Sequence, residues 1–207
     1  TTLFRSWFLS EVEVTKPFGY AWLEVDQIAC LGGPLSKVGT YMYEKCRGQE
    51  SPEFFTQALI ATQVSRMRGN TPTMPGAVKL VRELQSHGVK TALVSASPRN
   101  IVEAVLDNIG HDLFPFSISS DDVTKTKPDP EGYLKAAAIS DSDISNCLIF
   151  EDSLTGMSAA IASGAYLIAV PHLVTKQESS RVRVIKTLEQ LSFDKLIQLH
   201  SDFSSKI

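Results

Sequence analysis

Hydrophobic and polar positions alternate in two different ways along this chain, and the change falls near residue 75. Up to about Asn70 the pattern is mainly helical, with Trp, Phe and Met spaced irregularly among charged residues. From Pro75 onward, short apolar runs alternate with segments whose apolar residues recur at helical spacing. Short apolar runs between turns are typical of buried strands, whereas a 3.6-residue period is typical of amphipathic helices.

The second region therefore predicts a regular series of strands and helices. Strands are expected at 91–94, 116–119, 147–150 and 166–170, and helices at 77–84, 99–106, 131–138 and 155–163. Such alternation predicts βαβ units and a parallel sheet that is covered by helices on both faces. A basic, β-prone stretch at 181–185 predicts an edge strand, and 188–199 a closing helix.

The two patterns predict two domains. Gly, Asn, Thr and two prolines cluster between Gly69 and Pro75, which is typical of a linker. We therefore expect a small helical domain at residues 1–73 and an α/β core at residues 74–207. A helical segment placed before an α/β core suggests a lid or cap over the active edge of the sheet.

Composition excludes several classes of protein. The 207 residues are 43% hydrophobic and 21% charged with a net charge of -3, as in ordinary globular proteins. The sequence has no basic stripe, so its charge pattern gives no indication of nucleic-acid binding. No apolar run approaches the ~20 residues of a membrane span. Cys30, Cys46 and Cys147 form no CxxC pair, which favours reduced thiols and a cytoplasmic location. We expect a monomer, because no long apolar stripe is left unassigned.

Candidate chemistry gathers after the predicted strands, where ligands of open parallel sheets bind. Ser95 and Ala96 follow one strand, Lys127 comes after the next, and Glu151 and Asp152 follow a third. Adjacent carboxylates suit Mg²⁺, and a hydroxyl beside free backbone N–H groups suits phosphate. A lysine supplies a compact positive charge for a phosphoryl group in transfer.

Each of these residues has a structural alternative when taken singly. Ser95 could cap the next helix, Lys127 could be an ordinary exposed lysine, and 151–153 could be a solvated turn that caps a helix. Three separate strand ends that carry a hydroxyl, an ammonium and two carboxylates favour a shared site over three coincidences.

Three stretches carry a specific family resemblance, and they are Leu93-Val-Ser-Ala-Ser-Pro-Arg99, Lys127-Pro-Asp-Pro130 and Ile149-Phe-Glu-Asp-Ser-Leu-Thr-Gly156. Together they resemble the haloacid dehalogenase superfamily. The likeness is greatest to the branch with a helical cap after the first strand, which includes β-phosphoglucomutase-like proteins and many small-metabolite phosphatases. It runs over residues 11–171 and is strong from residue 74 onward.

The resemblance implies a Rossmann-like parallel core with a helical cap, and a Mg²⁺-dependent phosphohydrolase acting on a small phosphorylated metabolite. In this reading Ser95, with the neighbouring Ala96, would bind the phosphoryl group and Lys127 would stabilise its charge. Glu151 and Asp152 would help to hold Mg²⁺. A phosphomutase that returns the phosphoryl group to a sugar is the close alternative.

The stretch Leu31-Gly-Gly-Pro-Leu-Ser-Lys37 resembles the cap loop that reaches toward the substrate in this family. Lys37 is therefore a candidate substrate contact. The alternative is an ordinary lysine on the surface of a helix.

One departure from the family matters for function. The family's first motif is Asp-x-Asp-x-Thr, in which the first Asp forms an aspartyl-phosphate and the second acts as general acid and base. Thr2 is the candidate match for its threonine, which would place both aspartates before Thr1. The only Asp-x-Asp here, Asp141-Ser142-Asp143, lies in a polar turn and is expected to be structural.

Two explanations of this departure stay open: an N-terminal truncation of a working enzyme, or an inactive relative that still binds a phosphorylated ligand. In the family the first strand lies in mid-sheet, so its loss would leave backbone groups unpaired at about 1–3 kcal/mol each. Against a total stability of about 5–15 kcal/mol, this cost favours truncation. Residues 1–6 would then follow the missing strand, unless Thr1–Leu9, rich in β-formers, supplies a substitute.

Overall fold

The computed structural model describes residues 2–31, 33–170 and 178–204, and the chain divides into two compact units. The first, here called the helical unit, comprises Thr1–Pro72 with Glu103–Asn108, and the second, the sheet unit, comprises Thr73–Val102 with Ile109–Ile207. Among the described residues, none of the helices combines the length and hydrophobicity needed to cross a bilayer.

Among the described residues, the first 72 positions of the helical unit form the helices α1 (Thr2–Thr15), α2 (Glu24–Cys30), α3 (Leu35–Lys45) and α4 (Pro52–Gly69). Ser51 caps α4 by accepting a hydrogen bond from the Phe54 N–H, and Pro52 occupies the first helical position, where no N–H is needed. The helices enclose an apolar core around Trp22, Met42 and Leu59, and Trp7 packs against it.

The predicted substitute strand at Thr1–Leu9 is wrong, because α1 begins at Thr2. Ser6 and Ser10 are four residues apart, so a helix places both hydroxyls on one face. Both are buried and hydrogen-bonded to the side chain of Gln63 in α4, with a distance of 2.7 Å from Ser10 Oγ to Gln63 Oε1. Pairing with α4 therefore outweighs the β-propensity of the segment.

The elements of the sheet unit follow the predicted order. Its strands are β1 (Leu93–Val94), β2 (Ser117–Ile118), β3 (Leu148–Glu151), β4 (Tyr166–Ala169) and β5 (Val182–Val184). Its longer helices are α5 (Ala77–Ser86), α6 (Arg99–Ile109), α7 (Glu131–Ile139), α8 (Leu154–Ser163) and α9 (Phe193–Ser204), the middle of α6 counting with the helical unit. Short 3-10 turns lie at Lys16–Phe18, His111–Leu113, Ser120–Asp122, Ile144–Asn146 and Leu188–Gln190.

The closing helix begins later than the pattern predicts. Residues Leu188–Gln190 form a 3-10 turn, and α9 starts only at Phe193. The Ser192 hydroxyl accepts a hydrogen bond from the Lys195 N–H, which is the geometry of a helix cap. This cap separates the two segments, although the apolar period runs through both.

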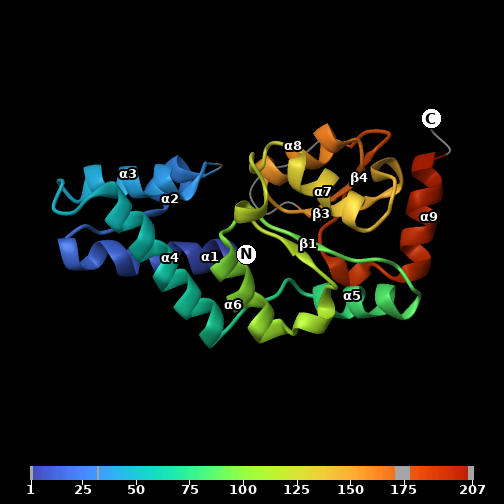
Figure 1. Ribbon diagram of the computed structural model, residues 1–207, viewed down its shortest axis with the longest axis horizontal. Helices are drawn as coiled ribbons and strands as arrows, with labels where there is room; N and C mark the ends of the chain where they lie inside the picture. Colours follow the sequence, from blue (N-terminus) through green and yellow to red (C-terminus); the bar gives the residue numbers. More distant parts are fainter. Residues whose placement is uncertain (1, 32, 171–177, 205–207) are drawn as a thin grey trace. The chain divides into compact units, whose positions relative to one another are not determined.

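The α/β prediction with parallel strands is confirmed, but the strands form two sheets among the described residues. β1 pairs with β2, and β3, β4 and β5 pair in that order, all in parallel. Figure 1 shows the strands between α7 and α8 on one side and α5 on the other. Along β4, Leu167 and Ala169 join the core beside α8, whereas Ile168 joins the core beside α5.

Candidate functional site

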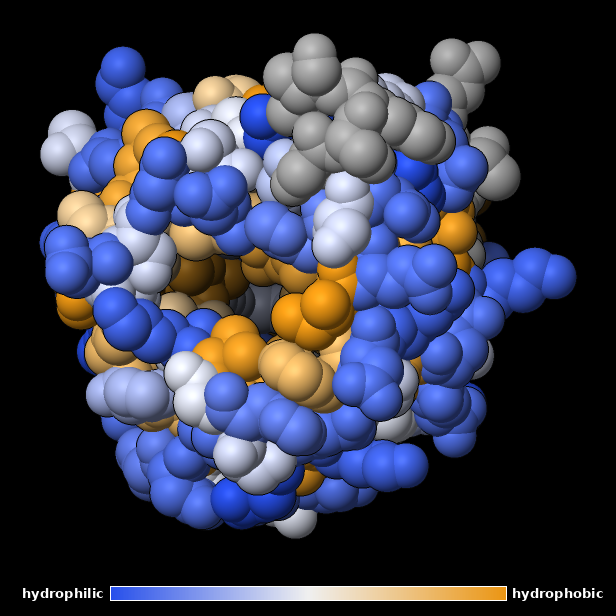
Figure 2. All heavy atoms as spheres, turned by 90° about the vertical axis from the view of Figure 1, so that its right-hand side faces the viewer, coloured by the Kyte–Doolittle hydropathy of each residue, from blue (hydrophilic) through white to orange (hydrophobic). Residues whose placement is uncertain are grey.

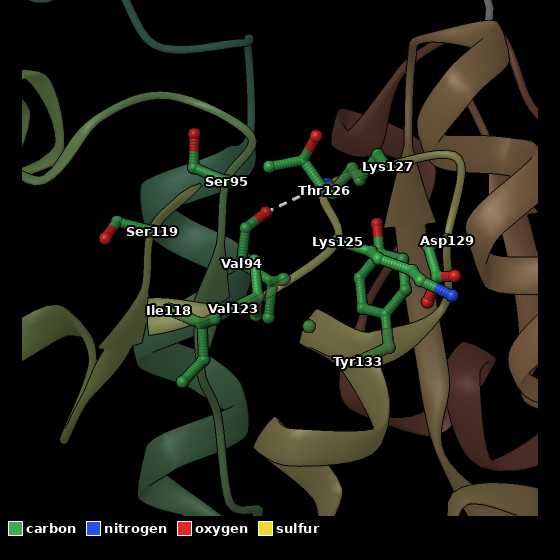
Figure 3. Close-up of a pocket in the computed structure, with 11 residues that line it drawn as sticks. Val94, Ser95, Ile118, Ser119, Val123, Lys125, Thr126, Lys127, Asp129 and Tyr133 are labelled. Atoms are coloured by element: carbon green, nitrogen blue, oxygen red, sulfur yellow. Dashed lines mark hydrogen bonds between the residues drawn. The ribbon is translucent and has the colours of Figure 1, made fainter. Parts of the chain in front are cut away.

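Lys127 joins the ends of two strands that belong to different sheets. Its Nζ donates a hydrogen bond to the Val94 carbonyl at the end of β1, at 2.9 Å, and pairs with the carboxylate of Glu151 at the end of β3. Figure 3 shows the bond to Val94 as a dashed line. A single ammonium reaches both strand ends, so β1 and β3 finish at the same edge of the unit.

The alternative of an ordinary exposed lysine at position 127 is wrong. The Lys127 side chain is 13% exposed, and its Nζ lies 4.8 Å from the centre of the Tyr133 ring. Burying this charge would be costly alone, but Glu151 offsets it at close range. The sequence around Lys127 therefore forms a fixed cation and not a solvated loop.

Glu151 is held on both oxygens. Oε1 accepts hydrogen bonds from Lys127 and from the Tyr133 hydroxyl, and Oε2 accepts one from the Ser153 hydroxyl at 3.0 Å. Burial and the Glu151 charge raise the pKa of Tyr133, so the phenol stays protonated and continues to donate. Gly156 makes room for this arrangement, because a Cβ there would overlap the Glu151 carboxylate.

Sequence reasoning missed Tyr133. It lies in the first turn of α7, six residues after Lys127, and it is buried. A tyrosine near a helix start is read most simply as core. Its hydroxyl meets Glu151 only because α7 packs beside β1 and β3, and this contact spans 18 residues of sequence with no local signal.

Asp152 differs from its neighbour. Burial, and then the charge of Glu151, raise the pKa of Asp152 above the usual range of a carboxyl group. No Lys or Arg pairs with it among the described residues. The Lys127 charge acts in the opposite direction and lowers this pKa. A cation that arrived beside this half-buried carboxylate would favour its charged form further.

The residues near Asp152 fit Mg²⁺ in part. Within the described part of the chain, no group of three or more His, Cys, Asp or Glu side chains gathers. Mg²⁺ uses one or two carboxylates and completes its shell with water and substrate phosphate, so a single carboxylate such as that of Asp152 could be enough to hold it. Glu151 could join only by releasing Lys127, Tyr133 or Ser153, and its metal role stays a prediction.

Ser95 and Ala96 form the turn after β1. The Ser95 N–H donates to the Ile118 carbonyl at 2.8 Å, and the Ser95 hydroxyl accepts from the Ser97 N–H at 3.1 Å. The capping alternative for Ser95 is wrong, because the first N–H of α6, at Arg99, donates to Asp121 instead. No bond to the exposed Ala96 N–H is found among the described residues, so an anion could accept one.

The space beside this turn is small. A cavity of about 10 Å³ lies between Ser95, Lys127 and Tyr133, with Thr126 and Asp129 on its wall. This volume suits one water molecule. At the edge of this cavity, Figure 3 shows the Ser95 and Thr126 hydroxyls pointing to the same side.

Lys37 belongs to the helical unit, and the Asp-x-Asp pair belongs to a turn of the sheet unit. Lys37 belongs to α3 of the helical unit, where its Nζ donates to the Ala29 carbonyl at 3.2 Å, and its substrate role stays a prediction. Asp141 has a φ of 47°, and the Asp143 carboxylate accepts from the Ser145 N–H at 2.9 Å. Both aspartates therefore shape a turn, as expected.

Comparison with known proteins places the chain in context. The family model of haloacid dehalogenase-like hydrolases matches residues 37–164. A bifunctional riboflavin kinase/FMN phosphatase of Arabidopsis thaliana is 32% identical over 187 residues, which are 86% of this chain and 48% of that protein. Hexitol phosphatase B of Escherichia coli strain K12 is 33% identical over 116 residues, 56% of this chain and 52% of that protein. The chain thus spans about half the length of these relatives.

Solved structures share the fold at lower identity. A β-phosphoglucomutase from Clostridium difficile superposes with a TM-score of 0.81 at 20% identity, covering 98% of this chain and 92% of that one. CbbY from Rhodobacter sphaeroides, solved with phosphate, gives a TM-score of 0.72 at 21% identity, covering 90% and 88% of the two chains. These likenesses support the fold prediction and do not by themselves assign an activity.

Proposed function

Because this chain belongs to the haloacid dehalogenase-like hydrolase family, we propose that it carries the phosphate-binding half of a Mg²⁺-dependent phosphohydrolase for small phosphorylated metabolites. The supporting observation is the buried ammonium of Lys127, fixed between the ends of β1 and β3. Ser95 follows one of these strands and Asp152 the other. A fixed cation, a hydroxyl and a carboxylate at one edge suit phosphoryl transfer.

Each side chain has a role in this proposal. The Ser95 hydroxyl and the Ala96 N–H would donate hydrogen bonds to two phosphoryl oxygens, and Lys127 would offset the charge that develops on them. Tyr133 and Glu151 act as positioning residues, because they hold the ammonium in place. Asp152 would hold Mg²⁺, which supplies further positive charge to the phosphate when it is bound.

The covalent step needs an Asp-x-Asp pair at the end of a strand, and the Asp-x-Asp of this sequence lies in a turn instead. In the proposed reaction an aspartate oxygen attacks phosphorus, the P–O bond to the metabolite breaks, and a second aspartate protonates the leaving oxygen. Water then attacks phosphorus, breaks its bond to the aspartate and releases inorganic phosphate, with the second aspartate taking the water's proton. Asp141 and Asp143 shape a turn, so the proposal assigns both aspartates to sequence outside residues 1–207.

The experiment separates binding from catalysis. The 207-residue chain should bind inorganic phosphate by calorimetry and fail to hydrolyse an aryl phosphate. Lys127→Met should weaken phosphate binding about 10-fold or more, because a charge-assisted bond is lost. Asp141→Asn, in the turn, is the matched control and should bind normally. Equal affinity of the Lys127→Met chain would contradict the site.

A second arm tests the reaction itself. An N-terminal extension that supplies a strand ending in Asp-x-Asp should confer Mg²⁺-dependent aryl phosphate hydrolysis. Asp152→Asn in that protein should abolish the activity at ordinary Mg²⁺ concentrations. If the folded, extended protein binds phosphate but shows no turnover, the enzyme proposal fails and the binding alternative stands.

Three related proposals accompany the main one. The first is the alternative of an inactive relative that still binds a phosphorylated ligand, which the turnover test of the extended protein distinguishes from the enzyme. A phosphomutase would move phosphate between two positions of a sugar, which ³¹P spectroscopy of the extended protein would detect. We also propose the helical unit as the cap and Lys37 as a substrate contact, so Lys37→Ala should raise KM with kcat little changed.

A further inference from the structure

The turn that follows β1 runs directly into α6, and two of its residues do not cap that helix. Pro98 lies just before α6, and a proline side chain offers no hydrogen-bond acceptor. The Ser95 hydroxyl accepts a hydrogen bond from the Ser97 N–H at 3.1 Å, within the turn. The first N–H groups of a helix need acceptors from outside the helix.

Asp121, from the segment after β2, supplies the cap. Its carboxylate accepts a hydrogen bond from the Arg99 N–H, the first of α6, at 2.9 Å. Asp121 lies 22 residues further along the chain than Arg99, in the 3-10 turn Ser120–Asp122. A carboxylate is a strong acceptor for an N–H group at a helix start. A residue from a neighbouring strand end thus fills the role that local sequence would give to Ser95.

Two backbone bonds fasten the same turn along its length. At the start of the turn, the Ser95 N–H donates to the Ile118 carbonyl at 2.8 Å. Further along, the Ser97 carbonyl accepts from the Ser120 N–H at 2.9 Å. With the cap on α6, the turn is therefore tied at three points to the end of β2 and the residues after it. A loop held in this way loses much of its freedom before a ligand arrives, so the ligand need not supply that ordering.

An ion pair fixes the segment that supplies the cap. The Arg99 guanidinium pairs with the Asp122 carboxylate and donates to the Ser117 carbonyl at 3.0 Å. Asp122 also accepts from the Ser119 N–H at 2.7 Å and from the Ser119 hydroxyl at 2.6 Å. Hydrogen bonds from Ser119, and after them the bond and charge of Arg99, lower the pKa of Asp122 to about 2, so this carboxylate stays charged at neutral pH. The position of the neighbouring Asp121 is therefore well defined.

We propose that Asp121 is a positioning residue, which caps α6 from outside the turn and thereby keeps the Ser95 hydroxyl in place for a phosphoryl group. This inference rests on the proposed phosphate site. The Ser95 oxygen accepts within the turn, which leaves its proton to be donated outward. Figure 3 shows this hydroxyl pointing out beyond the end of β1.

Two simpler roles for Asp121 predict different behaviour. A cap that served stability alone would leave the phosphate affinity of the folded protein unchanged when it is lost. An effect of charge alone would appear equally in Asp121→Asn and Asp121→Ala, because both remove the charge. A positioning cap separates these variants, since the asparagine oxygen still accepts from an N–H and alanine cannot.

The test measures binding of inorganic phosphate to the 207-residue chain by calorimetry. Asp121→Ala should weaken binding about fivefold, the factor that matches a lost cap of typical strength, whereas Asp121→Asn should bind within about twofold of the original chain. Asp121 is exposed, so neither substitution disturbs the packed core. Asp143→Ala is the matched control, because the Asp143 carboxylate accepts from the Ser145 N–H, also at 2.9 Å, in a turn without proposed ligand-binding residues. It should bind phosphate normally.

A double-mutant cycle tests whether Asp121 acts through Ser95. Ser95→Ala removes the hydroxyl that the cap is proposed to position. Adding Asp121→Ala to this variant should then weaken phosphate binding by less than about twofold, because the positioned group is already gone. Independent effects would multiply instead, and the full loss in the double variant would overturn the positioning role.

Hydrogen exchange provides a measurement that needs no ligand. The Arg99 amide should exchange about 10-fold faster in Asp121→Ala and at its original rate in Asp143→Ala. Faster exchange with unchanged phosphate affinity would overturn the proposal and leave the phosphate site standing. Equal losses of affinity in the Asn and Ala variants would also overturn it, in favour of charge. If the original chain binds no phosphate, the proposed function fails first, and this inference with it.

Discussion

Gly156 lets the carboxylate of Glu151 lie against the first turn of α8. A Cβ at this position would overlap that carboxylate, whose oxygens are already held by Lys127, Tyr133 and Ser153. The carboxylate cannot move aside without losing one of those bonds. Glycine is therefore needed here for space, and not for an unusual backbone angle.

We predict that Gly156→Ala lowers the free energy of unfolding by about 1–3 kcal/mol, the cost of forcing atoms into a packed site. It should also weaken phosphate binding, because displacing Glu151 frees Lys127. Gly69→Ala is the matched control, since nothing lies within 4 Å of the added Cβ at the end of α4. Chemical denaturation of both variants measures this, and equal stability would show that Glu151 has room to move.

Glu11 is a buried carboxyl group in the helical unit that the proposed chemistry does not use. Its side chain accepts a hydrogen bond from the Trp22 indole N–H at 2.9 Å. Burial raises the pKa of Glu11 to about 7, and the charge of Asp26 adds to this, while the bond from Trp22 lowers it. The folded protein thus keeps a proton that the unfolded chain releases near pH 4.5.

We predict that the titration of Glu11 lowers the free energy of unfolding as pH rises from about 4.5 to 7. The loss then levels off at a value on the order of 3 kcal/mol. The sign follows because the unfolded state binds fewer protons in this window. Glu11→Gln stays neutral and should remove the fall, making the variant the more stable protein at pH 8. Denaturation of both proteins at pH 5 and pH 8 measures the difference.

Glu13→Gln provides the control for this pH effect. Glu13 is exposed and pairs with Arg66 at 2.7 Å, so its loss should cost less than about 1 kcal/mol. If Glu11→Gln and Glu13→Gln behave alike between pH 5 and pH 8, the titration of a buried Glu11 is not the cause.

At the scale of elements, Ser153 links the start of α8 to the cluster at the end of β3. Its hydroxyl oxygen accepts a hydrogen bond from the Gly156 N–H at 3.1 Å, and the same hydroxyl donates one to the Glu151 carboxylate. One side chain therefore caps a helix and supports the carboxylate that holds Lys127. The alternative interpretation of this stretch as a helix cap was right for Ser153, and it coexists with the proposed site.

We predict that Ser153→Ala costs about 1 kcal/mol in stability, which is typical for a lost cap, and also weakens phosphate binding. Ser51→Ala removes the matching cap of α4 and should cost a similar amount without affecting phosphate. Thermal unfolding and calorimetry on the two variants separate the effects. Equal phosphate affinities in both would show that Ser153 is only a cap.

Local signals set how far the sequence could predict these elements. α8 ends at Ser163 as expected, because Gly164 takes the left-handed conformation with φ +83°. The start of α9 was placed too early, since the apolar period hid the cap at Ser192. Hydrophobic periodicity reports the buried face of a helix, and it does not report where the backbone turns.

The sequence predicted which residues of the candidate site lie near one another only as far as chain order allows. Ligands of open parallel sheets bind at the carboxyl ends of the strands, which lie at one edge, and this rule predicted that Ser95, Lys127 and Asp152 lie there. Tyr133 and the double bonding of Glu151 depend on how α7 packs beside β1 and β3, which local pattern does not encode. The division of the strands into two sheets was likewise invisible, since strand patterns say nothing of which edges pair.

At the scale of the whole molecule, each unit has its own hydrophobic core. Leu59 is fully buried in the helical unit, and Leu167 is fully buried in the sheet unit. Independent cores are what allow parts of a chain to unfold separately. A cavity of about 780 Å³, lined by β1 and β3, leaves the second core incompletely filled, and a cavity of this kind costs stability. On the face drawn in Figure 2 the surface is deeply hollowed, and hydrophobic residues surround the hollow.

We predict that Leu59→Ala and Leu167→Ala each cost about 2–5 kcal/mol, and that each loss stays in its own unit. Native-state hydrogen exchange should show faster opening of α3 and α4 in the first variant and of β3 to β5 in the second. Each variant serves as the control for the other. Faster exchange in both units from either substitution would show that the chain unfolds as one body.

Both tryptophans of this protein, Trp7 and Trp22, pack in the core of the helical unit. Intrinsic fluorescence excited at the indole band therefore reads that unit alone. A melting curve recorded in this way would stay flat while the parallel strands come apart. The five tyrosines divide between the units, and Tyr133 and Tyr166 lie among the strands and helices of the second, so tyrosine absorbance includes a contribution from that unit which tryptophan fluorescence lacks.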